Sequence, residues 1–214
     1  MRSRRTWLLF IVALIFSLVL IYPYLTLNIA NSRLTVRGSL HYAILVTHIF
    51  TATVALILGP LQFMPCVRAR KRLHRTVGRT YLLAGVLPSA AATIPVAIWS
   101  GRSVTQIGLT TAAILWLITA ALAYRAARRR DFNTHRAWMT RNYALTFLAV
   151  TSRILVPLLL LAQLPFGGGS IADRAPSMIP IGQTLGWIVN LVVAEFLIRR
   201  SARRRHSPAV RLGR

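Results

Sequence analysis

The chain has 214 residues, of which 55% are hydrophobic and 14% are charged, and its mean hydropathy is +0.56. This apolar content exceeds what a soluble core of this size buries, which excludes an ordinary soluble domain and predicts a polytopic membrane protein. The formal net charge of +24 would suggest nucleic acid binding in a soluble protein, so the placement of the charges decides its meaning. A single cysteine, Cys66, excludes an intramolecular disulfide and a cysteine-based metal site.

Six apolar runs are each near the roughly 20 residues that a helix needs to cross a bilayer. The first follows the basic start MRSRR, and we interpret it as a retained span because no small-residue cleavage pattern follows it. The predicted spans cover about residues 7–28, 41–63, 80–100, 108–126, 138–163 and 181–198. The sequence therefore predicts an all-α, six-transmembrane-helix domain over residues 1–200.

Three segments are predicted to interrupt or follow this regular pattern. Pro88 and Pro95 lie in the third span and predict kinks, because proline removes backbone hydrogen bonds. Residues 165–180 are rich in glycine and proline and predict a flexible linker. Residues 201–214 form a basic cytoplasmic tail without apolar periodicity, which we expect to be disordered or to lie on the anionic leaflet.

Basic residues fall mainly on one side of this topology. That side receives 22 of the 27 Lys and Arg residues, the other side receives Arg33, Arg37, Arg102 and Arg174, and Arg153 lies within the fifth span. The positive-inside rule then places both termini in the cytoplasm. This topology, together with contact with anionic lipid headgroups, accounts for the charge. We therefore expect the lipid bilayer as the partner and no nucleic acid, and the oligomeric state stays open.

The fifth span carries a polar seam. At 3.6 residues per turn, Asn142, Thr146, Ala149 and Arg153 fall on one face of the helix. Lipid cannot solvate such a face, so it must contact protein, water or a cofactor. An ionisable residue inside a span costs at least about 2.5 to 3.5 kcal/mol, which makes Arg153 a candidate functional residue.

The second span carries His48 on a face that continues through small residues such as Ala55 and Gly59, and small residues allow close helix packing. With a rise of 1.5 Å per residue, His48 lies roughly 10 Å below the outer boundary. Arg153 enters from the opposite side and reaches a similar depth. A site that joins His48 and Arg153 is therefore geometrically allowed.

The two predicted cytoplasmic loops share a pattern of histidine, arginine and tyrosine. His74, Arg75, Arg79 and Tyr81 are echoed by His135, Arg136, Arg141 and Tyr143, with one residue inserted in the second copy. One interpretation is an internal repeat of two helix hairpins. The other is that basic and aromatic residues are common at any cytoplasmic boundary.

Glu195 is the only acidic residue within a predicted span. Its depth in the sixth span is close to that of Arg141 and Arg136 at the start of the fifth. We expect a structural ion pair between Glu195 and one of these arginines. A proton-relay role would need a second acidic residue to receive the proton.

Four long segments of the chain are distinctive: HIFTATVALILGPLQF (48–63), LHRTVGRTY (73–81), HRAWMTRNYALTFLAVTSRILVPLLL (135–160) and NLVVAEFLIRR (190–200). These segments resemble the DUF2306 family of predicted bacterial multi-pass membrane proteins. The resemblance implies a bacterial cytoplasmic (inner) membrane protein and no particular activity. The motif positions in this chain are His48, Gly59, Pro60, Gln62, His74, Arg75, Gly78, Arg79, His135, Arg136, Trp138, Met139, Arg141, Arg153 and Glu195.

Two classes of function fit these residues. In the first, the protein has an unknown activity and its polar interior binds a ligand or a lipid headgroup. The binding candidates are His48, His74, His135, Arg79, Arg141 and Arg153. The alternative is a b-type haem-binding or quinone-linked redox protein in which His74 and His135 bind the haem iron. Neither a nucleophile with its base nor a phosphate loop or zinc motif is recognisable, so hydrolytic chemistry is not indicated and enzyme activity stays open.

The haem alternative resembles small membrane bundles of the cytochrome b561 type in its overall layout. Arginines near His74 and His135 would neutralise haem propionates. The chain departs from that type because His48 has no histidine partner at its own depth except His41 on the same helix. A second haem is therefore not expected.

Overall fold

The computed structural model describes residues 2–163 and 171–206, and within them the chain is helical and contains no strand. The α-helices are α1 (Arg2–Ile21), α2 (Ser39–Leu61), α3 (Pro65–Ala69), α4 (Lys71–Thr80), α5 (Leu87–Trp99), α6 (Ser103–Arg128), α7 (Phe132–Thr146), α8 (Leu148–Ala162) and α9 (Ile171–His206). Two 3₁₀ turns, η1 (Tyr22–Tyr24) and η2 (Ile29–Asn31), follow α1, and a π-helical segment, η3 (Tyr81–Val86), joins α4 to α5.

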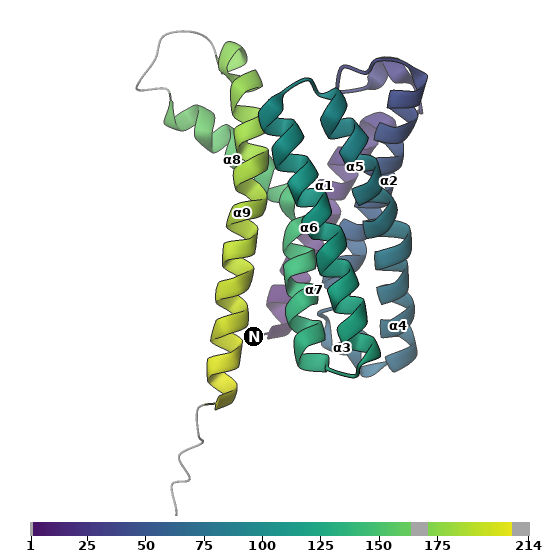
Figure 1. Cartoon of the computed structure of the whole chain (residues 1–214), viewed down its shortest axis with the longest axis vertical. Helices are drawn as coiled ribbons and strands as arrows, with labels where there is room; N and C mark the ends of the chain where they lie inside the picture. Colours follow the sequence, from purple (N-terminus) through teal and green to yellow (C-terminus); the bar gives the residue numbers. More distant parts are fainter. Residues whose placement is uncertain (1, 164–170, 207–214) are drawn as a thin grey trace, which may run out of the picture.

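Five helices are long and apolar enough to cross a membrane, and α7 with α8 forms a sixth span if this bent pair is counted as one. The predicted all-α, polytopic membrane fold is confirmed. The start of α1 and the end of α9 lie at the same end of the bundle, together with α3, α4 and the turn between α6 and α7 (Figure 1). An even number of crossings is needed to bring both ends there, which agrees with six spans.

The third span is longer than the sequence indicated and runs over Lys71–Trp99. Its turn widens into η3 directly before Pro88. Proline lacks a backbone N–H and its ring crowds the preceding turn, so a wider turn accommodates it. Pro95 lies inside α5, which continues to Trp99.

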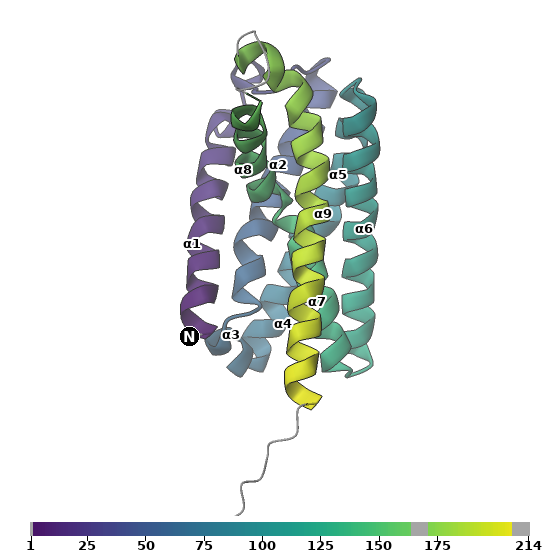
Figure 2. The same ribbon diagram turned by 90° about the vertical axis from the view of Figure 1, so that its left-hand side faces the viewer.

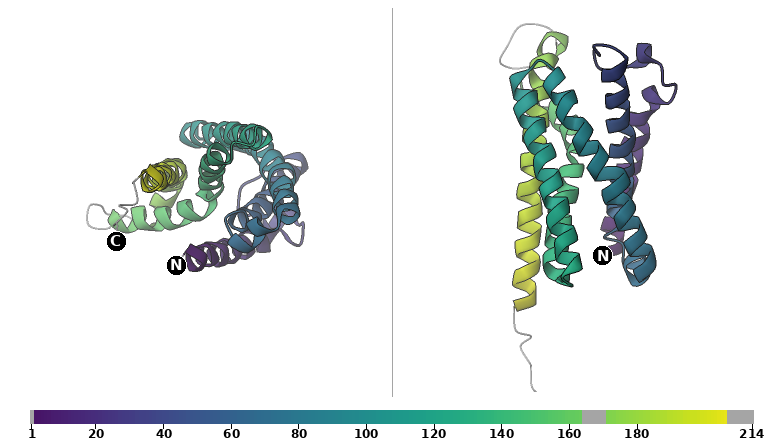
Figure 3. Two further views of the ribbon diagram at one scale, coloured as in Figure 1. Left: turned by 90° about the horizontal axis from the view of Figure 1, so that it is seen from below. Right: turned by 45° about the vertical axis from the view of Figure 1, so that its right-hand side comes forward.

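The fifth predicted span, 138–163, is not one straight helix, because α7 and α8 meet at an angle of 47°. No proline lies at the break. The Thr146 hydroxyl lies 3.1 Å from the Asn142 carbonyl, four residues earlier, and back-bonding of this kind often bends helices. Beyond Phe147, α8 therefore leaves the bundle axis and extends between α1 and α9 (Figures 2 and 3).

The expected linker over 165–180 and the expected tail over 201–214 are both shorter than predicted, because α9 extends over Ile171–His206. Contacts with neighbouring segments accompany the longer helix. Nη1 of Arg174 donates to the Gln163 carbonyl at 3.0 Å, and Nη1 of Arg102 donates to the Pro176 carbonyl at 3.3 Å. Beyond Pro180, α9 packs tightly against α8, because a Cβ atom on Gly182 would overlap Val156 and one on Gly186 would lie 2.9 Å from the Leu148 side chain. The helix persists despite Pro176 and Pro180. Residues 164–170 and 207–214 lie outside the part of the chain that the structure describes.

Small residues allow α2 to pack closely against η3 and α7, as the small residues on its face suggested. A Cβ atom on Gly85 would lie 2.9 Å from the backbone nitrogen of Ala55. The ring of Tyr143 lies directly over Gly59. The backbones of α2, η3 and α7 therefore approach closely around a core in which Tyr81 and Tyr143 are buried.

Candidate functional site

A buried polar network joins three helices at the centre of the bundle. The hydroxyl of Tyr81 donates to Oδ1 of Asn142 at 2.6 Å and lies 2.9 Å from Oγ1 of Thr146. The Asn142 amide donates to the Trp116 carbonyl at 2.8 Å and to Oγ1 of Thr119 at 2.9 Å. The indole N–H of Trp116 donates to Thr146 at 3.0 Å. Every member is buried, so the network fixes the positions of η3, α6 and α7 relative to one another.

Sequence reasoning found one side of this network, because Asn142 and Thr146 share the polar seam. The sequence did not indicate that Tyr81, Trp116 and Thr119, which lie on other helices, are the hydrogen-bond partners of this seam. An alternation of polar and apolar residues shows which face of one helix must be covered. It carries no signal for the partner that covers it.

The half of the bundle away from the start of α1 and the end of α9 contains a cavity of about 290 Å³, which we call the outer cavity. It is lined by apolar side chains from several helices and by the polar side chains of His48, Thr93, Ser152, Arg153, Arg33 and Gln183. The structure thus brings His48 and Arg153 to one cavity. Arg33 and Gln183 were not singled out from the sequence, since one lies in an outer loop and the other in the expected linker-adjacent part of the last span.

His48 is held in one orientation by α5. Its Nδ1 lies 3.1 Å from the Ser89 carbonyl, 3.0 Å from Oγ of Ser89 and 3.0 Å from Oγ1 of Thr93. The Ser89 carbonyl can only accept, so its contact with Nδ1 favours the tautomer that carries the proton on Nδ1 and leaves Nε2 as the acceptor.

Arg153 presents a positive charge to the same cavity. Its Nη1 donates to the Ala149 carbonyl of its own helix at 2.7 Å, and no carboxylate pairs with it among residues 2–163 and 171–206. Arg33 lies close enough for the two like charges to repel each other. Tyr24 also lies within range of an electrostatic interaction with Arg153. Arg33 and Arg153 thus both line the outer cavity, both are exposed, and neither pairs with a carboxylate in the described part of the chain.

Gln183 contributes an unused acceptor. Its Oε1 is buried and has no hydrogen-bond partner in the described part of the chain. A buried acceptor without a partner is unfavourable by about 1 to 3 kcal/mol, so it signals a missing donor. Thr184 and Trp187, on the neighbouring turn of α9, hold two further buried polar atoms without partners.

The histidines at the basic end lie apart from the outer cavity. Nδ1 of His135 lies 2.9 Å from the Ala123 carbonyl. His74 lies close enough to His135 for an electrostatic interaction between the two imidazoles. Nδ1 of His74 is buried without a hydrogen-bond partner among the described residues. Arg79 is exposed on α4. The outer cavity and the groove that Arg136 lines, described below, include neither His74 nor His135 in their walls.

Glu195 joins α9 to α7 through Arg141. Nη2 and Nε of Arg141 lie 2.6 Å and 3.2 Å from Oε2 of Glu195, and Nε of Arg199 lies 3.1 Å from Oε1. The Arg141 guanidinium also lies 4.7 Å from the ring centre of Trp138. Arg136, the other partner that the sequence suggested, lines the neighbouring groove. Arg141 thus serves a structural contact and does not reach the outer cavity.

No cluster of three or more His, Cys, Asp or Glu side chains that could hold a metal ion occurs in residues 2–163 and 171–206. A family model described as "Predicted membrane protein (DUF2306)" matches residues 45–198, which is well over half of the chain. No curated protein and no solved structure matches the chain. The matched range includes His48, Arg153 and Gln183, whereas α1 and Arg33 lie before it.

Proposed function

This chain belongs to the DUF2306 family of predicted membrane proteins. We propose that it is a membrane-embedded binding protein for a small anionic amphiphile. The ligand occupies the outer cavity, where Arg153 and Arg33 hold its phosphate or carboxylate. The observation that carries this proposal is the pair of arginines that face one cavity without a counter-charge. Two like charges repel each other, and an anion between them removes that repulsion.

The remaining polar groups narrow the chemistry of the ligand. Nε2 of His48 and Oε1 of Gln183 are both acceptors, so the ligand supplies an O–H or N–H donor as well as an anionic group. Side chains such as Leu45, Ile49 and Leu109 form most of the remaining wall, which suits a short apolar body. A volume of about 290 Å³ lies at the lower end of the range for ligand pockets, roughly 300 to 1,000 Å³.

We further propose that the protein lies in the bacterial cytoplasmic membrane with both termini in the cytoplasm. The positive-inside rule supports this orientation, because the end of the bundle that holds the start of α1 and the end of α9 is also the end that holds most of the arginines. The outer cavity then opens toward the extracytoplasmic side. A ligand would enter it from that side or from the outer leaflet.

The experiment is a thermal-stability titration of the purified protein in detergent with hexyl phosphate as the probe. Ligand binding to the folded state raises the unfolding temperature in a concentration-dependent way. We expect this rise for the wild type and for Arg37→Gln, a control that removes a basic residue from the same side but not from the cavity wall. Arg153→Gln should abolish the rise. Equal stabilisation of all three proteins would contradict the proposal.

A second candidate, haem binding, rests on the proximity of His74 and His135 and on the bare Nδ1 of His74. His135 has the pattern of many metal-binding histidines, in which one ring nitrogen is bonded to a backbone carbonyl and the other is left for the metal. Protein purified from a haem-replete host would then show a Soret band that shifts on reduction. His74→Ala and His135→Ala would remove it, and His41→Ala would not. Colourless protein after reconstitution with haem would rule this candidate out.

A further inference from the structure

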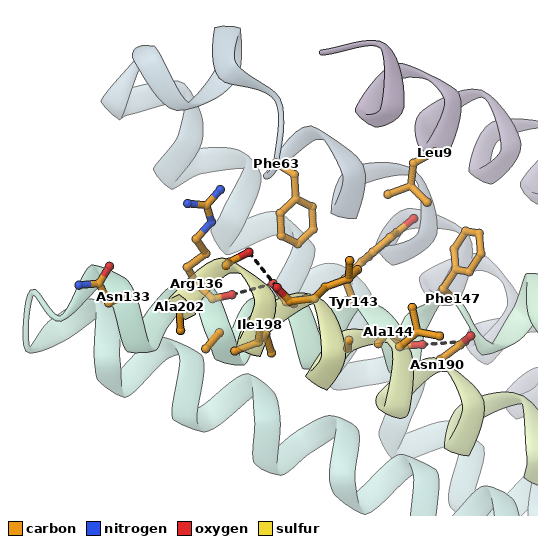
Figure 4. A pocket seen from close by; sticks show the side chains of 16 residues that line it. Leu9, Phe63, Asn133, Arg136, Tyr143, Ala144, Phe147, Asn190, Ile198 and Ala202 are labelled. Carbon is orange, nitrogen blue, oxygen red and sulfur yellow. Dashed lines mark hydrogen bonds between the residues drawn. The ribbon is translucent and has the colours of Figure 1, made fainter. Parts of the chain in front are cut away.

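A groove of about 730 Å³ lies at the basic end of the bundle, away from the outer cavity (Figure 4). We call it the inner groove. Its floor is α7, and its sides are the facing parts of α1 and α9. The break at Phe147 creates it, because α8 extends between α1 and α9 in the outer half and leaves the inner half between them without a helix (Figures 2 and 3).

The polarity of the inner groove changes along its length. Asn133, Arg136 and Ala202 lie at one end, whereas Leu9 and Phe147 lie at the other (Figure 4). The polar groups deeper in the groove already have partners inside the protein. Tyr143 donates to the Leu56 carbonyl at 3.3 Å, and Asn190 donates to the Ala144 carbonyl at 2.9 Å. The deep end therefore presents an apolar surface, and the shallow end presents a cation at the boundary of the membrane.

This gradient matches a molecule with an anionic head at the boundary and an apolar chain toward the centre of the bilayer. Arg200 and Arg203, on the last turns of α9, add positive charge at the same end. A second copy of the chain is a poor occupant, because copies inserted with the same orientation would bring their basic ends together.

We propose that the inner groove binds one phospholipid with an anionic headgroup, as an integral part of the folded protein. Its phosphate lies at Arg136, and one acyl chain runs along Val193 and Leu197 toward Phe147. The side chains of Val193 and Leu197 are about half exposed, at 51% and 49%. The chain covers these surfaces and fills the space that the bend between α7 and α8 leaves. The site is separate from the outer cavity and does not depend on the proposed function.

Two adjacent valines on α9 provide a matched test. Val193 lines the groove, whereas Val192 does not and is 64% exposed. Each would be replaced by tryptophan, and the proteins would be reconstituted in nanodiscs with equal amounts of phosphatidylglycerol and phosphatidylcholine. Native mass spectrometry after mild detergent release then counts the lipids that stay bound. We expect one phosphatidylglycerol on the wild type and on Val192→Trp, and a several-fold loss of this complex for Val193→Trp.

Arg136→Gln separates the headgroup contact from the chain contact. This variant should retain one lipid but lose the preference for phosphatidylglycerol over phosphatidylcholine. It also decides the question if Val193→Trp does not fold, which size-exclusion chromatography would reveal. Equal lipid retention by both tryptophan variants, an unchanged headgroup preference for Arg136→Gln, or a wild type without bound lipid would overturn the proposal. A bound mass equal to a second copy of the chain would do so as well.

Discussion

Glu195 and Arg153 show how differently two charged side chains of the predicted spans are accommodated. Glu195 was expected to pair with an arginine of the fifth span, and its carboxylate lies against Arg141 and Arg199. Arg153 has only a backbone carbonyl of its own helix as a hydrogen-bond partner in the described ranges. The spacing of residues in a sequence predicts the depth of a charge within a span. It does not predict whether a partner from another helix reaches that depth.

The ion pair should contribute modestly to stability. Its side chains are 25% and 36% exposed, and pairs of this kind typically contribute about 0.2 to 1 kcal/mol. Glu195→Gln should therefore lower the unfolding temperature in detergent by a few degrees and leave the fold intact. Arg72→Gln, which changes an exposed arginine of α4, is the matched control and should leave this temperature unchanged. A loss of folded protein for Glu195→Gln would mean that the pair is more buried than the structure indicates.

Asn142 should matter more than the ion pair. It is fully buried and bonds to groups on η3 and α6. Asn142→Ala removes its bonds to Tyr81, Trp116 and Thr119 and leaves the Tyr81 hydroxyl with one fewer partner, at an expected cost of about 1 to 3 kcal/mol in the free energy of unfolding. Denaturant unfolding in mixed micelles measures this change. Asn133→Ala, at the exposed start of α7, should have a much smaller effect, and equal effects would contradict the role of the network.

At the scale of helices, the sequence predicted which segments cross the membrane but not where they bend. Apolar runs set the number of spans, because only helices satisfy the backbone in lipid. No proline lies at the break at Phe147 to indicate it in the sequence. The break is accompanied by a hydrogen bond from the Thr146 hydroxyl to the Asn142 carbonyl. The outer part of α9 was assigned to a linker because of Pro176 and Pro180, and packing against α8 overrode that local preference.

Close helix contact at Gly85 predicts a sharp difference between two glycines of the same span. A Cβ atom on Gly85 would lie 2.9 to 3.0 Å from Ala55, including its backbone, which cannot move aside easily. Gly85→Ala should therefore destabilise the protein by about 1 to 3 kcal/mol. At Gly78 the nearest group is Oε1 of Gln62, at 3.2 Å and at the end of a flexible side chain. Gly78→Ala should be neutral or stabilising, and thermal unfolding of both variants checks the difference.

The start of α7 should depend on pH. Asp131 caps this helix, because its Oδ1 accepts from the Thr134 amide at 3.0 Å, and the hydrogen bonds from Thr134 lower the pKa of this exposed carboxyl. A lowered folded-state pKa means that the stabilisation is complete above the unfolded pKa, near 3.9, and is lost as the pH falls through the folded pKa. Hydrogen exchange at the Thr134 amide should therefore accelerate, relative to its intrinsic rate, only below about pH 4. Asp131→Asn should show no such pH dependence, because asparagine also caps helices without titrating.

At the scale of the whole molecule, the two helix hairpins share more than their loop pattern. Tyr81 and Tyr143 occupy equivalent positions in that pattern, and both are buried. Regular α-helix is interrupted near both of them, because η3 begins at Tyr81 itself and α7 continues past Tyr143 and ends at Thr146. The shared burial and the nearby interruptions favour the interpretation as a repeat. The departure of α8 from the bundle is what makes the second hairpin different and opens the inner groove.

The proposed topology has a direct test in reporter fusions. Fusions after Arg37, Arg72, Arg102, Arg130, Arg174 and Arg214 should alternate between outside and inside, beginning outside. The fusion after Arg174 is the most informative, because it follows the bent pair α7 and α8. A cytoplasmic signal there would mean that α7 and α8 do not cross the membrane together. An extracytoplasmic signal after Arg72 or Arg130 would reject the orientation.

A density map of the protein in lipid nanodiscs would show directly whether the outer cavity holds an anion between Arg153 and Arg33. We expect non-protein density that contacts both guanidinium groups and continues between His48 and Gln183. Arg153→Gln should remove that density while leaving the helices in place. A wild-type map in which the cavity holds only water and the Arg153 side chain extends to the outer headgroups would contradict the account.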